Sequence, residues 1–199
     1  MVDTELRLGV WRDGHTQAER LAAAALKLAG FDEVEPQAPL GGPDRARDII
    51  CSRGGITWVG AVYFPNAPVR FTAIKKKFEN DLKGVMAKHK GFAFITNQNL
   101  TLTQRDKLIQ IARAKKKELF LLHLENLRAL LDSPSGYGIR LQFLRIPMAI
   151  EEQLSYFSES GTQLSNALNA NTRELMALKA MIQGMQAGQS EMVRTIALI

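Results

Sequence analysis

Apolar positions follow two different periods along the chain, and together they predict alternating helices and strands. Residues 56–64 and 91–96 are apolar on both faces, which is typical of strands in the middle of a sheet. Residues 71–90 and 102–115 carry apolar side chains at helical spacing. The remaining expected elements are helices over 17–29 and 125–131 and strands over 47–51 and 118–123. This order predicts an α/β fold with a mixed sheet flanked by helices.

The pattern changes after residue 153, where a heptad repeat replaces the mixed periods. Eleven core positions can be written between Leu164 and Ile199, and nine of them are apolar, which predicts a long coiled-coil helix. We therefore expect a domain over 1–150 and a helical oligomerisation segment over 151–199. The expected oligomerisation residues are Leu164, Leu168, Leu175, Leu178, Ile182, Met185, Met192 and Ile196. The alternative is that this helix packs back on the domain.

Composition excludes several protein classes. With 23% charged and 46% hydrophobic residues in 199, the chain resembles a soluble globular protein. One cysteine, Cys51, excludes an internal disulfide, and three scattered histidines form no zinc-ligand pattern, so each histidine is expected to be structural. No apolar run is long enough to span a membrane, and we expect a cytoplasmic protein.

Positive charge is concentrated in the middle of the chain. Residues 41–117 carry 16 basic and 5 acidic side chains, whereas the flanking segments are mildly acidic. Such a surface attracts phosphates, although solvated helix faces would give the same count. The candidate nucleic-acid contacts are Arg45, Arg47, Lys75, Lys76, Lys77, Arg105, Lys115 and Lys116.

One stretch suggests a family. Glu19 lies on the first expected helix, Gly30-Phe31 follows that helix, and the turn 41–44 leads to Asp48 at the start of a strand. This arrangement, over about residues 10–125, resembles the restriction-endonuclease-like PD-(D/E)xK superfamily and, within it, the Mrr-type branch. The resemblance implies that Asp48 binds Mg²⁺, a hard cation that takes oxygen ligands, and that Glu19 is the family's first-helix glutamate.

The motif that the superfamily carries on its third strand is degenerate in this chain. The family has Glu/Gln-x-Lys there, and this chain has Gly60-Ala61-Val62. Glycine and valine offer no side-chain ligand or hydrogen-bond donor. The resemblance therefore implies a nuclease fold with a broken active site.

Three functions remain open. We favour a catalytically degenerate, oligomeric module without a cofactor, which binds nucleic acid, DNA in preference, and serves with a partner protein in a bacterial defence system. The second is an active Mg²⁺-dependent endonuclease in which Asp48 and Glu19 act with Glu79 and Lys75 or Lys77 from the helix over 71–90. That spacing is equally that of a solvated ion pair. The third is a scaffold that only binds proteins.

Overall fold

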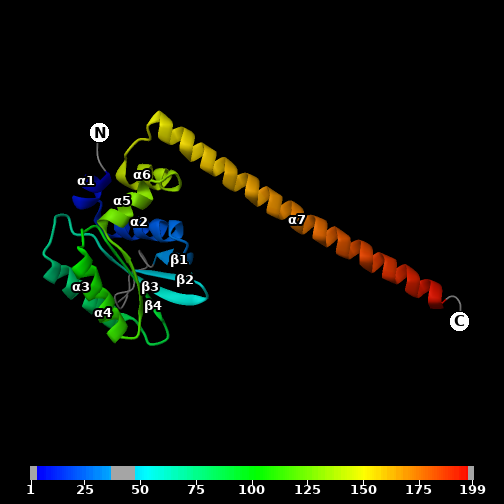
Figure 1. Ribbon diagram of the computed structural model, residues 1–199, viewed down its shortest axis with the longest axis horizontal. Coiled ribbons are helices and arrows are strands. Elements are labelled where there is room, and N and C mark those ends of the chain that lie inside the picture. The colour runs from blue at the N-terminus through cyan, green and yellow to red at the C-terminus, as the bar shows by residue number, and fades with distance from the viewer. Residues whose placement is uncertain (1–3, 37–47, 197–199) are drawn as a thin grey trace. The chain divides into compact units, whose positions relative to one another are not determined.

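The computed structural model describes residues 4–36 and 48–196, with side chains in the last helix described as far as 183 and at 185. It contains a five-stranded sheet in the order β1-β2-β3-β4-β5 (Figure 1). The strands are β1 (Asp32–Pro36), β2 (Ile49–Arg53), β3 (Ile56–Tyr63), β4 (Gly91–Thr96) and β5 (Glu118–Leu122). The helices are α1 (Thr4–Gly9), α2 (Gly14–Leu28), α3 (Phe71–Gly84), α4 (Leu102–Ala114), α5 (Leu124–Leu131), the 3₁₀ turn η1 (Pro134–Gly136), α6 (Tyr137–Leu144) and α7 (Ile150–Ile196).

The sheet is mixed, as expected. β1, β2 and β3 pair antiparallel, and β3, β4 and β5 pair parallel. Gly54 and Gly55 both have positive φ and form the turn that joins β2 to β3 in a β-hairpin. The expected α/β fold with a mixed sheet, flanking helices and a long C-terminal helix is therefore confirmed.

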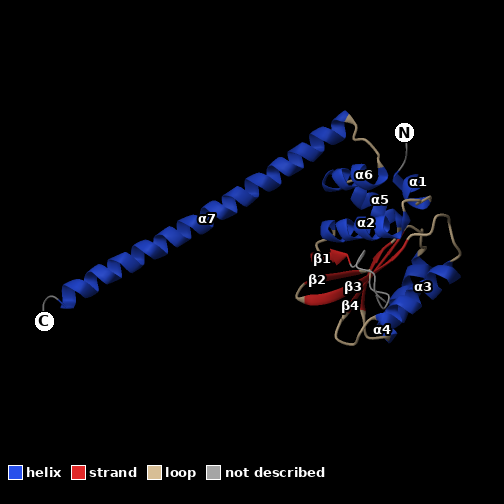
Figure 2. Cartoon of the chain, turned by 180° about the vertical axis from the view of Figure 1, so that it is seen from behind, coloured by secondary structure: helices blue, strands red, loops and turns tan. Residues whose placement is uncertain are grey.

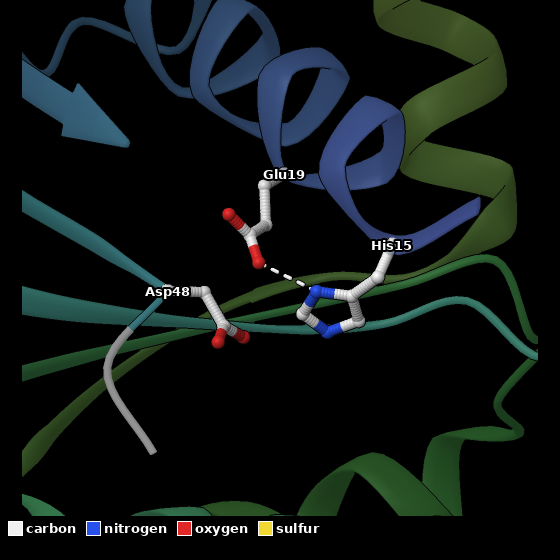
Figure 3. A group of neighbouring side chains, drawn as sticks. All are labelled: His15, Glu19 and Asp48. Atoms are coloured by element: carbon white, nitrogen blue, oxygen red, sulfur yellow. Dashed lines mark ion pairs between the residues drawn. The ribbon is translucent and has the colours of Figure 1, made fainter. Parts of the chain in front are cut away.

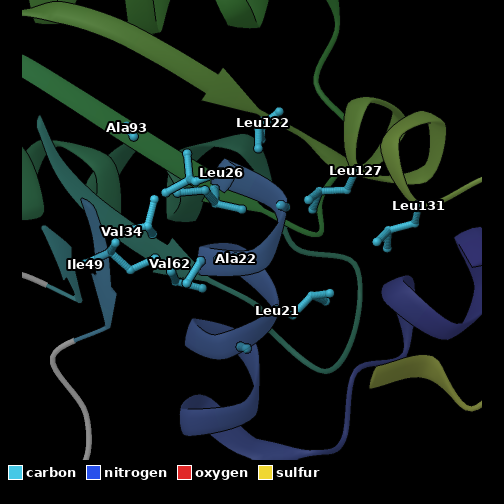
Figure 4. Close-up of a cluster of buried hydrophobic side chains, with 14 of the residues drawn as sticks. Leu21, Ala22, Leu26, Val34, Ile49, Val62, Ala93, Leu122, Leu127 and Leu131 are labelled. Atoms are coloured by element: carbon cyan, nitrogen blue, oxygen red, sulfur yellow. The ribbon is translucent and has the colours of Figure 1, made fainter. Parts of the chain in front are cut away.

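Helices cover both faces of the sheet (Figure 2). On one face, α2 and α5 pack over a core that contains Leu26, Ile49, Val62 and Leu127 (Figure 4). On the other face, α3 and α4 pack over a second core that contains Phe78. β3 serves both cores, because alternate side chains of a strand point to opposite faces.

Cys51 lies in the middle of β2, opposite Trp58 of β3. Its side chain is buried among the residues of the first core. Burial raises the pKa of the thiol to about 11, because the thiolate would lose its hydration. The thiol is therefore protonated and enclosed in the folded protein.

A buried arginine joins the helices beside the first core. Arg140 of α6 is 5% exposed and pairs with Asp132 at 2.9 Å and with Glu152, in the first turn of α7, at 2.5 Å. The hydroxyl of Thr4 donates a 2.6 Å hydrogen bond to the same Asp132 carboxylate. Because each carboxylate compensates the buried guanidinium, this network fixes α1, α6 and the start of α7 together.

The chain divides into two compact units, 1–153 and 154–199. The second unit consists of α7 beyond its first turn. None of the helices described in the structure is both long and apolar enough to cross a membrane.

Some elements differ from the sequence expectation. α1, β1 and α6 were not expected, and β1 has only one buried residue, Val34, because it is an edge strand rich in acidic residues. The helix expected over 71–90 ends at Gly84, and α7 begins before the heptad pattern does.

Replacing Gly91 by alanine should destabilise the domain. Gly91 lies beside Trp58 in the parallel β3–β4 register, and a Cβ there would lie 2.1 Å from the indole ring. We expect Gly91→Ala to lower the free energy of unfolding by about 1–3 kcal/mol, because the ring has to move. Chemical denaturation measures this. Gly9→Ala is the control, since nothing lies within 4 Å of its Cβ, and an equal loss in both variants would contradict the interpretation.

Candidate functional site

Asp48 is held against β3 by two hydrogen bonds. Its backbone N–H donates to the carbonyl oxygen of Gly60 at 3.1 Å, which extends the β2–β3 pairing by one residue. Its carboxylate Oδ2 accepts the backbone N–H of Val62 at 2.6 Å. The sheet thus fixes the direction of the carboxylate as well as the position of the backbone.

α2 brings a second carboxylate and an imidazole to Asp48 (Figure 3). Glu19 is 4% exposed, and His15, one turn earlier, is largely exposed. His15 Nδ1 lies 2.5 Å from Glu19 Oε1, as the i,i+4 spacing on a helix allows. One ligand atom from each of His15, Glu19 and Asp48 can be chosen so that all lie within 4.8 Å of one another.

This group of side chains, the His15–Glu19–Asp48 cluster, fits a divalent cation. Two carboxylate oxygens and one imidazole nitrogen are ligands that Mn²⁺ and other first-row metals accept, and Mg²⁺ accepts the oxygens. A cation would also offset the repulsion between two neighbouring carboxylates. The structure therefore brings Asp48 and Glu19 together and adds His15, which was expected to be structural, and their roles as metal ligands stay a prediction.

β3 adds no side-chain ligand. Position 60 pairs with Ile49, and a Cβ at Gly60 would lie 3.0 Å from the Cβ of Ile49. That distance is tighter than ordinary packing, so a longer side chain needs β2 to shift. Val62 is buried in the first core. Positions 60 and 62, which the sequence resemblance aligned with an acid and a lysine, are thus occupied by packing.

α3 supplies a lysine and a carboxylate instead. Lys77 Nζ lies 2.7 Å from Oδ1 of Asp81, and Asp81 is 3% exposed. Burial raises the pKa of Asp81, the hydrogen bond and charge of Lys77 lower it, and the negative charge of Asp48 raises it further. This pair lies on α3, and within the described structure no hydrogen bond or ion pair joins it to Asp48.

The pair expected from the sequence on this helix, Lys75 with Glu79, lies elsewhere. Its 3.7 Å contact joins side chains that are 44% and 39% exposed, which is the solvated ion pair considered as the alternative. A catalytic role for Glu79 stays a prediction, and Asp81 is a second carboxylate on the same helix that the sequence analysis did not single out. Ile74, Phe78 and Leu82 form the buried stripe of α3, and the two pairs lie on opposite sides of that stripe.

The candidate nucleic-acid contacts are dispersed. Arg45 and Arg47 lie outside the described residues. Lys76 on α3, Lys115 at the end of α4 and Lys116 beside it are exposed. α3 and α4 contact each other, so these lysines belong to one helical layer. Arg105 of α4 is half-buried.

Removing Glu19 should abolish metal-dependent stabilisation. A cation that binds only the folded protein stabilises it, by about 2.7 kcal/mol when its concentration is about a hundred times its Kd. The melting temperature then rises. We expect Mn²⁺ to raise the Tm of the parent and of Glu79→Gln, but not of Glu19→Gln or His15→Ala. Differential scanning calorimetry with and without Mn²⁺ measures it. Equal stabilisation of all four proteins would exclude the cluster as the site.

Comparisons with known proteins find a structural likeness. No family model and no curated protein sequence matches the chain. Among solved structures, it is similar to the MspJI restriction endonuclease in complex with a 27-mer oligonucleotide, with 14% sequence identity and a TM-score of 0.42. The match covers 64% of this chain and 30% of that enzyme, so the chain corresponds to less than a third of its length.

Proposed function

We propose that this chain is a nuclease-fold module that binds nucleic acid without cutting it. The observation that supports this most directly is the structure of β3. The Val62 N–H donates a hydrogen bond to a carboxylate oxygen of Asp48, and the side chain of Val62 is buried in the core. Phosphodiester cleavage needs a group that positions the water and offsets charge on the phosphate. On β3, where the family has that lysine, there is valine.

Lys77 does not simply replace the missing lysine. Its ammonium is paired at 2.7 Å with a carboxylate that is itself buried. Moving Lys77 towards a phosphate would leave Asp81 buried without its cation, which is costly. The pair therefore serves better as a fixed part of the structure than as a mobile catalytic group.

The proposed ligand is DNA, through the basic layer of α3 and α4. Membership of the Mrr-type branch and service in a bacterial defence system with a partner protein are part of this proposal and rest on the sequence resemblance. The proposed cellular location is the cytoplasm, and the module needs no cofactor for binding.

Plasmid retardation should be sensitive to salt and to exposed lysines. Phosphate contacts release counterions, so the logarithm of affinity falls with the logarithm of salt by about 0.9 per contact. We expect the Lys76→Gln, Lys116→Gln double variant to bind more weakly. The slope of its log affinity against log salt should be smaller, by the amount that the loss of up to about two phosphate contacts gives. The control, Arg173→Gln with Lys179→Gln, removes the same charge from α7 and should bind like the parent. Equal loss in both variants would indicate only a net-charge effect.

A second candidate is an active metal-dependent endonuclease, and the His15–Glu19–Asp48 cluster is what favours it. In that case Asp48 and Glu19 hold the metal, and Lys77 with Asp81 stands in for the third-strand groups. The same plasmid incubated with Mg²⁺ or Mn²⁺ distinguishes the two candidates. Nicking by the parent and not by Asp48→Ala would establish the enzyme and overturn our proposal.

α7 is the proposed oligomerisation element. Its described heptad core side chains, from Leu164 to Met185, are 43% to 67% exposed, apart from the polar Asn171 position. An exposed apolar seam of this length is typical of a helix that pairs with another. Met192 and Ile196 continue the pattern in sequence, but their side chains lie outside the described part of the structure. If neither nicking nor retardation of the plasmid is observed, the remaining function is that of a scaffold that binds proteins through this helix.

Substituting the seam should dissociate the oligomer. We expect Leu178→Glu to shift the protein to monomer in analytical ultracentrifugation, because a buried charge at a core position is costly. Met176→Glu makes the same kind of change two positions away, outside the seam, at a side chain that is also exposed in the single chain. It should leave the assembly intact. A parent that is already monomeric at high concentration would refute self-association.

A further inference from the structure

A second polar site lies at the end of β5, built from different residues than the His15–Glu19–Asp48 cluster. A cavity of about 240 Å³ opens between α4, the last part of β5 and the start of α5. It is lined by Leu102, Arg105, Asp106, Ile109, Leu121, His123 and Asn126. In sheets with parallel strands, ligands bind at the carboxyl ends of the strands, and His123 directly follows β5.

His123 is buried there with neither ring nitrogen hydrogen-bonded. The residue is 6% exposed, and no described group lies within hydrogen-bond distance of Nδ1 or Nε2. Buried polar side chains in native proteins are nearly always hydrogen-bonded, to protein, water or a ligand. An enclosed imidazole that lines a cavity and has no hydrogen bond at either nitrogen in the described structure therefore indicates a missing partner.

Arg105 lines the same cavity and is also incompletely satisfied. Its Nε is enclosed, and within the described part of the chain it has no hydrogen-bond acceptor. No carboxylate of the described residues forms an ion pair with its guanidinium. Such a half-buried cation needs an anion, because its hydration is partly lost.

The acidic groups nearby do not supply that anion. Glu125, in the first turn of α5, pairs with Arg128 at 2.5 Å. Asp106 is exposed and forms no ion pair with any described residue. α5 begins at Leu124, so the positive end of its peptide dipoles also lies beside the cavity.

We propose that this cavity is an oxyanion site that takes a phosphate group, with Arg105 and His123 as its hydrogen-bond donors. The guanidinium offers several N–H donors in one plane, and the imidazole offers one N–H when neutral and two when protonated. Asn126 and the apolar side chains form the rest of the cavity wall. The phosphate can belong to a nucleic-acid backbone or to a free anion, and the site does not depend on the proposed function.

Anion binding has a signature at His123. Burial lowers the pKa of this imidazole, the positive charge of Arg105 lowers it further, and Glu125 opposes them. An anion between Arg105 and His123 acts in the opposite direction and stabilises the imidazolium. Binding should therefore raise the pKa of His123, and the anion should bind more tightly as the pH falls through that pKa.

The test follows the three histidine rings by NMR in the full-length protein labelled with ¹⁵N-histidine. Sodium sulfate is the free-anion probe, because its charge is constant across neutral pH, and sodium chloride of equal ionic strength is its control. We expect sulfate to raise the pKa of His123 by about one unit, which corresponds to about tenfold tighter binding to the protonated form. His89 lies outside the cavity and should not respond. A short DNA oligonucleotide is the second probe.

Variants of the cavity residues distinguish a specific anion site from a general effect of ionic strength. Arg105→Gln should abolish the response of His123 to sulfate, Arg105→Lys should retain part of it, and Asp106→Asn should strengthen it several-fold by removing a negative charge. The unchanged signal of His89 in each variant reports that the fold is intact. An equal response in Arg105→Gln and the parent would overturn the proposal.

The two probes also identify the source of the phosphate. A His123 response to the oligonucleotide alone assigns a nucleic-acid backbone, and a response to sulfate alone assigns a free anion. No response to either probe refutes the oxyanion site. If the plasmid is still retarded in that case, nucleic-acid binding stands without this cavity.

Discussion

The burial of β3 on both faces is the constraint on which the rest of the structure depends. Val59 and Ala61 face the core under α3 and α4, and Trp58 and Val62 face the core under α2 and α5. A strand in that position has no room for an acid and a lysine unless both are compensated. The chain therefore places its charges around the strand: on α2, before β2 and on α3. Asp48 is the link, since its carboxylate is fixed by the backbone of β3 and its charge acts on Asp81.

The sequence predicted the central strands of the sheet well, because their buried side chains form continuous apolar runs. The apolar runs of β3 and β4 were sufficient, because burial on both faces leaves few polar positions in a strand. β1 was missed because it is an edge strand in which four of five residues are exposed, so its sequence is that of a polar loop. The charged pairs of α3 show another limit. They lie on opposite sides of the buried stripe, and the helical pattern alone does not say that Asp81 is buried whereas Glu79 is partly exposed.

The histidines illustrate what a sequence hides. His15 had a usable signal, because it precedes Glu19 by one helical turn and shares its face. His123 had none. Its importance comes from enclosure beside an arginine on a different helix, which brings together residues 18 positions apart through the packing of α4 on β5. Burial and the absence of a partner in the described structure are properties of the fold, and they cannot be deduced from residue type.

The single thiol in β2 gives the molecule a built-in reporter of its own opening. Cys51 is enclosed in the first core and protonated at neutral pH, so an alkylating reagent reaches a thiolate only when that core opens. The core includes α2, which carries His15 and Glu19, so an opening that moves α2 away from the sheet also separates these two residues from Asp48. The rate at which the thiol is consumed therefore measures how often the site itself disassembles. A cation that bridges α2 and Asp48 would slow that rate without touching the cysteine.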